Sequence, residues 1–485
     1  MHATDRKHTR KLWLIVPRKG WPRRVFIAIN VIAVPLFIFM LLPRIVAWYS
    51  RPLGRDTDYP AIVEARVADA QRPGPNGWQH LVDAWAEADR IRRDIAAEHN
   101  LPPKALNHRV FGSPDRWEEG VTQKHVEQYR QALAPSSVPQ HLSALAKAPR
   151  FVRPINPERK LNGLLMPNLV GVRHLGIYAA TAANDAIRNG DDAIAANASE
   201  QLLALARLTR FQCASIDTIV AGALLVRFAH VVEDAAYQGQ LDEPLIEHLL
   251  IVMDAQSDRP LRTHAIETER RFALDLGQWT HTRRGRALPG ELSRWIDPKT
   301  RTFRDVSRVK DNLQGFDLPH ADESRKAIDD FYDLVAEDAL TPRSDRAKRD
   351  YEALAVQNWL LFHSVSNTQA HITSLDLAAA TESITRTALH IELRRARTNA
   401  LPVSLNALDL PPAITRDPMT ADQQLRYCID PQAPLGYRLY SIGLDCIDNG
   451  GHPPLQGEDP NSGAILFGAL SGRPIPEKPY TLAAP

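Results

Sequence analysis

Eighteen consecutive residues, Val25–Leu42, carry no charged side chain. The hydrocarbon core of a bilayer is about 30 Å thick, and a helix needs roughly 20 apolar residues to cross it. Ile45–Trp48 extend the apolar stretch past Arg44, and Trp48 and Tyr49 stand where aromatic residues meet the headgroups. The sequence therefore predicts a transmembrane anchor over residues 25–49, with the lipid bilayer as the partner of Val25–Leu42.

Two other interpretations of this stretch are a buried core helix and a cleaved signal peptide. A core helix of this length usually has a polar stripe, whereas this one offers only Asn30. A signal peptide has a shorter apolar region followed by small residues at a cleavage site, and LLPRIVAWYS contains no such site. We expect an uncleaved, single-pass anchor.

Charge on the two sides of the anchor predicts its orientation. Residues 1–24 hold eight lysines and arginines against a single acid, Asp5. The positive-inside rule places this basic tail in the cytoplasm and the bulk of the chain on the other side. Of the 59 basic and 57 acidic residues, 51 and 56 follow the tail, a net charge of −5. The slight overall basicity therefore reflects topology, and we expect no nucleic-acid partner.

Residues 51–365 are predicted to form an irregular helical bundle. Hydrophobic and charged contents of 44% and 24% are those of an ordinary globular protein. Asn189–Gly190 is a signal for the end of one helix, and Asp191 is a cap for the next helix. Ile216–Gln238 is apolar on three sides, as expected of a central core helix. Further helices are expected at Gly77–Asn100, Pro114–Ala134, Leu245–Asp254, Arg262–Gly277, Asp345–Phe362 and Asn367–Thr398.

Two histidine–glutamate pairs are the candidate catalytic residues. His230 with Glu233, and His264 with Glu267, each place an imidazole and a carboxylate on one helix face, as acid–base or metal chemistry requires. The structural alternatives are a core histidine at residue 230 and an ion-paired surface around Glu267. Cys213 is expected to be a small buried hydrophobe. The chain has no zincin motif, nucleophile elbow, P-loop, dinucleotide fingerprint or CxxC.

Residues 283–310 form a basic segment. Nine lysines and arginines stand against three acids there, a net charge of +6. Such a segment suits anionic headgroups or an acidic partner. The alternative is a solvated loop whose arginines pair with acids elsewhere in the chain.

The pattern changes period near the C-terminus. Apolar residues alternate along Leu425–Ile429 and Tyr437–Ser441, and Ala464–Leu470 is a third short apolar run. Residues 366–485 are therefore predicted to hold one helix followed by a three-stranded antiparallel sheet. The fold class we expect is mainly α: a single transmembrane helix, a helical-bundle ectodomain and a small C-terminal α+β module.

Residues 367–470 resemble the C-terminal module of type II secretion pseudopilins and related bacterial envelope proteins. The matching residues are Leu401-Pro402-x-x-Leu405, Asp417-Pro418, Tyr427 and Tyr440-Ser441-x-Gly443-x-Asp445-x-x-Asp448-Asn449-Gly450-Gly451. In pseudopilins the corresponding loop binds calcium. The resemblance implies oxygen donors for calcium at Asp445, Asp448, Asn449 and Asp459. It also implies an inner-membrane location, with the bulk of the chain in the periplasm.

This chain departs from the pseudopilin pattern in three ways. It lacks the short leader and the glutamate-bearing assembly helix, and it inserts some 300 residues between anchor and module. Cys446 follows Asp445 where a small residue is usual, so Cys428 and Cys446 could form a disulfide in place of a calcium site. The acidic loop could also be a tight turn whose side chains bond local amides.

Two functions follow from these expectations. The first is an envelope interaction or scaffold protein that presents a helical body and a pilin-like tip to a protein partner. The second is a membrane-anchored periplasmic hydrolase that uses the histidine–glutamate pairs. The absence of a catalytic motif favours the non-enzymatic function.

Overall fold

The computed structural model describes residues 57–69, 71, 73–102, 105–107, 118–155, 161, 167–210, 212, 215–254, 261–281, 320–356, 368–451 and 465–467. Within these ranges, no helix combines the length and the apolar character that a membrane span requires. The expected tail and anchor, including Val25–Leu42, lie outside the described residues.

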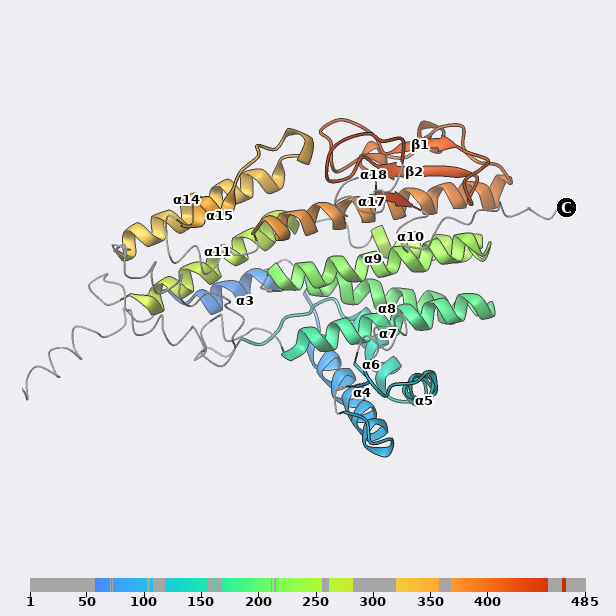
Figure 1. Ribbon diagram of the computed structural model, residues 1–485, viewed down its shortest axis with the longest axis horizontal. Helices are drawn as coiled ribbons and strands as arrows, with labels where there is room; N and C mark the ends of the chain where they lie inside the picture. Colours follow the sequence, from blue (N-terminus) through green and yellow to red (C-terminus); the bar gives the residue numbers. More distant parts are fainter. Residues whose placement is uncertain are drawn as a thin grey trace, which may run out of the picture.

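The molecule is an elongated stack of helices (Figure 1). α7, α8, α9 and α17 run alongside one another, α10 lies against α8 and α17, and α4, α5 and α6 cover the α7–α8 side. Their bounds are α4 Trp78–Glu98, α5 Gln123–Leu133, α6 Val138–Lys147, α7 Pro167–Asn189, α8 Asp192–Arg210, α9 Ser215–Tyr237, α10 Glu243–Asp254 and α17 Thr368–Thr398. The fold is mainly helical, as the sequence predicts.

The α7–α8 hairpin forms as predicted from its turn residues. Gly190 adopts a φ of +71°, which is accessible to glycine at little cost and ends α7. The Asp191 carboxylate then accepts a hydrogen bond from the Ile194 amide at 3.2 Å, at the start of α8. The two helices bury their alanine-rich faces against each other, with Ala179, Ala183 and Ala198 fully or almost fully shielded from solvent.

α9 is the central helix, as predicted. It contacts α7, α8, α11 and α17, and its Leu224, Phe228 and Val231 are buried in the first hydrophobic core. The packing against α7 is close, because a Cβ on Gly176 would lie 2.3 Å from a methyl group of Leu224. Substituting Gly176 therefore requires the leucine to move, which fixes the spacing of these two helices.

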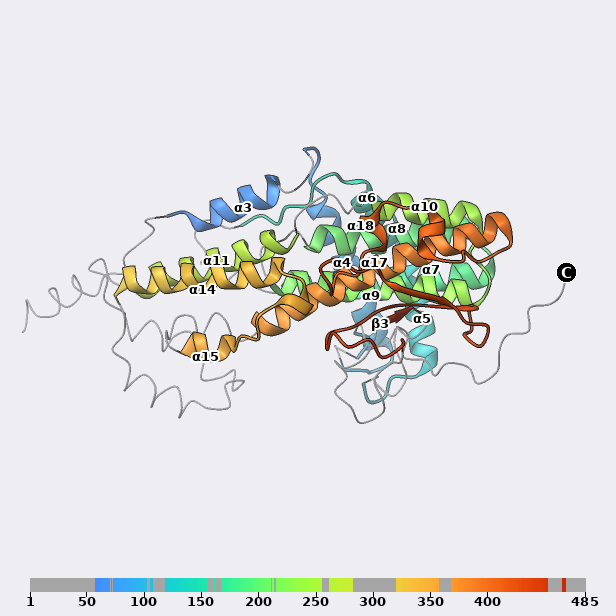
Figure 2. The same ribbon diagram turned by 90° about the horizontal axis from the view of Figure 1, so that it is seen from above.

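A second hydrophobic core occupies the other end of the stack. It is formed mainly by α3 (Tyr59–Asp69), α11 (Leu261–Thr280), α14 (Ala321–Leu340) and α15 (Tyr351–Val356), with Ile372 of α17 and with Val152, Ile155 and Leu161. Figure 2 shows α3, α11 and α14 side by side at this end. α14 was not predicted, although Ile328, Phe331, Val335 and Ala339 have helical spacing and are all buried.

Two predicted helix boundaries are wrong. The helix expected from Pro114 begins at Gln123, because Gly120 has a φ of +85° and Thr122 caps the helix in a capping box with His125. The helix expected over Asp345–Phe362 is broken. A single 3₁₀ turn, η5 (Arg343–Asp345), is followed by extended chain to residue 350, and only α15 is helical before the described residues stop at 356.

The C-terminal strands form a small antiparallel sheet on α17. β1 (Arg426–Ile429) pairs with β2 (Tyr437–Ser441), and β3 (Ile465–Phe467) pairs with the other edge of β2. Strands β2 and β3 both contact α17. The short helices η6 (Leu405–Leu408) and α18 (Pro412–Thr415) connect α17 to the sheet.

The first core runs across the expected domain boundary at residue 366. It contains Ile384, Leu389, Leu439 and Phe467 from the C-terminal part together with residues of α4 to α10. α17 therefore belongs to the bundle as much as to the C-terminal module, and it carries the sheet on its outer side.

Candidate ligand-binding site

The two histidine–glutamate pairs lie in different parts of the molecule. His230 and Glu233 are in the C-terminal half of α9, beside residues of the first core, and the Glu233 side chain is fully buried. His264 is on α11 next to Ile266 of the second core. Glu267 faces two arginines, with its oxygens 3.1 Å from Arg270 and 3.5 Å from Arg271. The structure does not bring the two pairs together.

In the acidic C-terminal loop, the carboxylates of Asp445 and Asp448 accept hydrogen bonds from nearby residues. Asp448 accepts hydrogen bonds from Arg426, from the Tyr440 hydroxyl and from the Gly450 amide, all at 3.0 Å. The Asp445 carboxylate accepts the Ile447 amide at 3.1 Å. A cation at Asp448 would have to displace a guanidinium.

Both described carboxylates of this loop are thus bonded locally, and calcium binding there stays a prediction. No cluster of three or more potential metal ligands occurs among the described residues, and Asp459 lies outside them. Asn449 is placed in the turn between Asp448 and Gly450, and Gly450 and Gly451 take φ values of +71° and +78°. This is the tight-turn arrangement that the sequence left open as an alternative.

Cys428 and Cys446 are both free thiols in the described structure, and the expected disulfide is not formed. Cys428 is exposed on β1 and is paired in register with Arg438. Cys446 packs against the small cluster formed by Met419, Ile442 and Leu444, and burial raises the pKa of its thiol. Cys213 and the basic segment 283–310 lie outside the described residues.

The structure instead places a pocket of about 770 Å³ between α9 and α17. That volume lies within the range of small-molecule sites. One wall is apolar and is made of short side chains of both helices, with Gly222 facing Ala378 so closely that a Cβ on the glycine would touch the alanine at 3.4 Å. The lining residues are Arg210, Thr218, Ala221, Gly222, Leu225, Asp254, Arg262, Leu375, Ala378, Ala379, Glu382, Ser383, Arg386, Ala413, Ile414 and Pro418.

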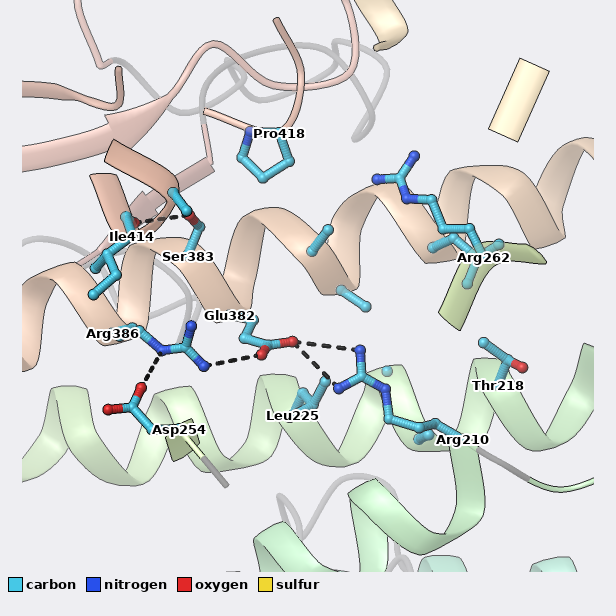
Figure 3. Close-up of a pocket in the computed structure, with 16 residues that line it drawn as sticks. Arg210, Thr218, Leu225, Asp254, Arg262, Glu382, Ser383, Arg386, Ile414 and Pro418 are labelled. Atoms are coloured by element: carbon cyan, nitrogen blue, oxygen red, sulfur yellow. Dashed lines mark hydrogen bonds and ion pairs between the residues drawn. The ribbon is translucent and has the colours of Figure 1, made fainter. Parts of the chain in front are cut away.

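A row of alternating charges crosses the polar side of this pocket (Figure 3). The Glu382 carboxylate lies between two guanidinium groups: Arg210 donates to one oxygen at 3.3 and 3.4 Å, and Arg386 donates to the other at 3.3 Å. Asp254 continues the row, 3.4 Å from the Arg386 Nε. We call Arg210, Glu382, Arg386 and Asp254 the charge row.

The charge row runs from the protein interior to the surface. The side chains of Arg210 and Arg386 are 10% and 11% exposed, whereas that of Asp254 is 58% exposed. Burial lowers the pKa of Arg210, and the nearby Glu382 carboxylate opposes this effect. The arginine at the inner end of the row is therefore only partly compensated by its neighbours.

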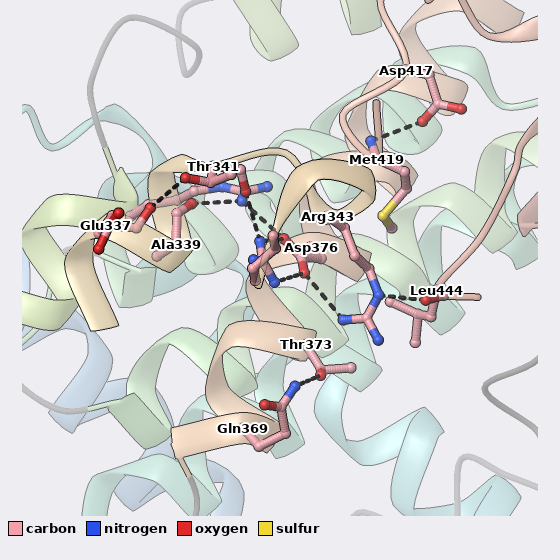
Figure 4. A network of polar contacts seen from close by, with 12 residues as sticks. Glu337, Ala339, Thr341, Arg343, Gln369, Thr373, Asp376, Asp417, Met419 and Leu444 are labelled. Carbon is pink, nitrogen blue, oxygen red and sulfur yellow. Dashed lines mark hydrogen bonds and ion pairs between the residues drawn. The ribbon is translucent and has the colours of Figure 1, made fainter. Parts of the chain in front are cut away.

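Arg262 connects the pocket to a second polar cluster, in which Figure 4 shows Asp376 and Arg343. It lines the pocket but donates to Asp376 and to the Ala339 carbonyl, both at 2.8 Å. Arg346 donates to both oxygens of Asp376, at 2.7 and 3.1 Å, and Arg343 lies 3.5 Å from it. Asp376 therefore joins α11, α17 and the chain after α14 directly behind the pocket.

Sequence reasoning did not find this pocket. Its charged residues come from the ends of α8, α10 and α11 and from the middle of α17, so no local spacing connects them. Arg386 and Glu382 are four residues apart on α17, and this i,i+4 pair was the one local signal available. Comparisons with protein-family models, with curated proteins and with solved structures found no match to this chain.

Proposed function

We propose that this chain is a single-pass inner-membrane protein whose periplasmic helical body binds a ligand and takes part in envelope interactions without catalysis. The observation that carries this proposal is the pocket between α9 and α17, with its apolar wall and its charge row. Five helices and the α18 region converge on it. Its described lining contains no histidine or cysteine, and the Ser383 hydroxyl is engaged with the Ile414 and Arg416 carbonyls. These features favour binding over hydrolysis.

The proposal includes the pseudopilin-like tip, a three-stranded antiparallel module on α17. Residues of the shared motifs contact one another in the structure, which supports this part. The Tyr427 hydroxyl donates to the Pro402 carbonyl at 2.8 Å, and Asp417 accepts the Ser441 hydroxyl at 2.7 Å and the Ile442 amide at 3.1 Å. These contacts hold the parts of the tip to one another, and the Tyr437 hydroxyl, which donates to Glu392 of α17 at 2.9 Å, joins the tip to the bundle.

Membrane topology is the first prediction from this proposal. The apolar stretch Val25–Leu42 and the basic residues before it support an anchor with the N-terminus in the cytoplasm. Protease added to spheroplasts is expected to digest the C-terminal bulk and to spare an epitope placed before residue 24. Protection of the bulk, with digestion of the N-terminal epitope, would reverse the orientation.

Blocking the pocket is the second prediction. Ala379→Trp places an indole in the space between α9 and α17 and is expected to abolish ligand retention. Ala353→Trp is the matched control, because Ala353 is exposed on α15, away from the pocket. Native mass spectrometry of the full chain, after incubation with a metabolite extract, should show a bound molecule on the wild type and on Ala353→Trp only. Identical spectra for all three proteins would refute binding in this pocket.

A further inference from the structure

The charge row contains more hydrogen-bond donors than acceptors. One carboxylate, that of Glu382, is shared by two buried guanidinium groups, each of which carries five N–H donors. All three of its contacts measure 3.3–3.4 Å. Charge-assisted N–H···O bonds are usually about 2.7–2.9 Å long. Arg386 also donates to the Met253 carbonyl at 3.2 Å and lies 3.4 Å from Asp254. Glu382 therefore holds neither arginine closely, and each guanidinium has more N–H donors than these contacts use.

Positive charge exceeds negative charge in the interior part of the charge row. Arg262 shares the Asp376 carboxylate with Arg343 and Arg346, so its ion pair lies outside the charge row. Arg210 and Arg386 remain, and among the described residues Glu382 is the buried carboxylate that contacts both, with a side chain 16% exposed. Asp254, whose side chain is 58% exposed, lies 3.4 Å from the Arg386 Nε and balances the second guanidinium from the surface. Among the described residues, the interior part of the charge row thus holds two guanidiniums against one buried carboxylate, and the fourth charge stands at its outer end.

Apart from the charged residues, Thr218 and Ser383, the lining is apolar. Ala221, Leu225, Leu375 and Ala378 are almost fully buried and belong to the two facing helices α9 and α17. Burying apolar atoms against this wall contributes favourable free energy of binding. The polar end of the same ligand must then reach the charge row.

We propose, building on the binding function above, that the ligand is an amphiphilic anion. Its carboxylate or phosphate head lies between Arg210 and Arg386 beside Glu382, and its apolar body lies against the alanine and leucine wall. Planar guanidiniums suit both head groups, because paired N–H donors match the spacing of two anionic oxygens.

Four six-carbon probes test the ligand class on the full chain: hexanoate, hexyl phosphate, hexan-1-ol and hexylamine, measured by saturation-transfer NMR titration. Hexanoate or hexyl phosphate is expected to bind at least tenfold more tightly than the alcohol, because a charge-assisted contact is worth about that factor. The amine is expected to bind most weakly. The alcohol binding as tightly as both anions, or the amine more tightly, would overturn the inference.

Three variants locate the head group. Glu382→Gln removes the competing carboxylate and is expected to strengthen anion binding about tenfold, whereas Arg386→Gln is expected to weaken it about tenfold. Arg397→Gln is the matched control. It lies on the same helix, pairs with Glu243 and Glu247, and should bind like the wild type. A weaker anion affinity in Glu382→Gln would contradict the proposed position of the head group.

The outcomes separate this inference from the proposed function. If hexan-1-ol binds as tightly as the anions and Ala379→Trp still prevents its binding, the pocket binds ligands but is not an anion site. If none of the four probes binds and Ala379→Trp changes nothing, both proposals fail. If Glu382→Gln lowers the melting temperature, the increase in melting temperature caused by hexanoate still reports the affinity.

Discussion

Replacing Asp376 by asparagine is expected to lower the free energy of unfolding by about 3–5 kcal/mol, the usual cost of breaking a buried ion pair from one side. The Asp376 side chain is 1% exposed and faces Arg262, Arg343 and Arg346. Asparagine has almost the same shape, so the loss comes from three guanidiniums left without their counter-charge. Arg343 also donates to the Leu444 carbonyl, so the disturbance should reach the C-terminal module.

A melting curve of the full chain in detergent checks this prediction. Asp376→Asn should melt roughly 3–8 °C below the wild type, because the shift in melting temperature per kcal/mol is small for a chain of this length. Asp330→Asn is the control: Asp330 is 61% exposed and pairs only with Lys326 on the surface of α14. Such exposed pairs contribute about 0–1 kcal/mol. Equal melting temperatures for the two variants would show that the Asp376 cluster is not a structural junction.

The protein is expected to lose stability in mild acid because of His371. This side chain is 4% exposed, and burial lowers its pKa to about 4 from the ordinary value of 6.5. The folded state therefore resists protonation, and protonation favours the unfolded state. The contribution of neutral His371 to the free energy of unfolding is fully present above pH 6.5. It falls as the pH drops below that value and is lost near pH 4. A shift of this size corresponds to roughly 3 kcal/mol in total and about 2 kcal/mol by pH 5.

Melting temperatures measured between pH 7 and pH 5 test this prediction. His371→Leu should flatten the profile, whereas His248→Leu should keep it, because the His248 side chain is 39% exposed on α10. His390 adds to the slope in the same direction, since burial lowers its pKa as well. An unchanged slope in His371→Leu would show that His371 is not the group responsible.

Local signals in the sequence predicted the central helices well. Gly190 and Asp191 end α7 and begin α8 as expected, and the apolar faces of α9 and α17 identified two core helices. One wrong helix boundary has a tertiary cause. The segment after Arg343 reads as helical, but Arg346 donates to Asp376 and to the Thr341 carbonyl, and its chain is extended. Tertiary contacts thus override helix propensity at that position.

The candidate site could not be predicted in the same way. His230 and Glu233 have a functional spacing, yet the structure places Glu233 fully inside the bundle. Arg210 and Asp254, by contrast, are unremarkable residues near helix ends, and they acquire a role only when α17 packs across them. No spacing in the sequence predicts that the Ser441 hydroxyl donates to Asp417, or that Arg426 donates to Asp448, because each bond joins residues more than 20 positions apart.

The core that spans residue 366 has a consequence for biosynthesis. The face of α9 and α10 that α17 covers is made well before α17 itself, since roughly 140 residues separate the ends of α10 and α17; at ordinary rates of translation this takes roughly 10 s. Ile384, Ala388 and Ile391 of α17 are all fully buried in the finished protein. During that interval the nascent chain presents an uncovered apolar groove. Folding in the cell is therefore expected to depend on a chaperone that shields this groove until the last long helix arrives.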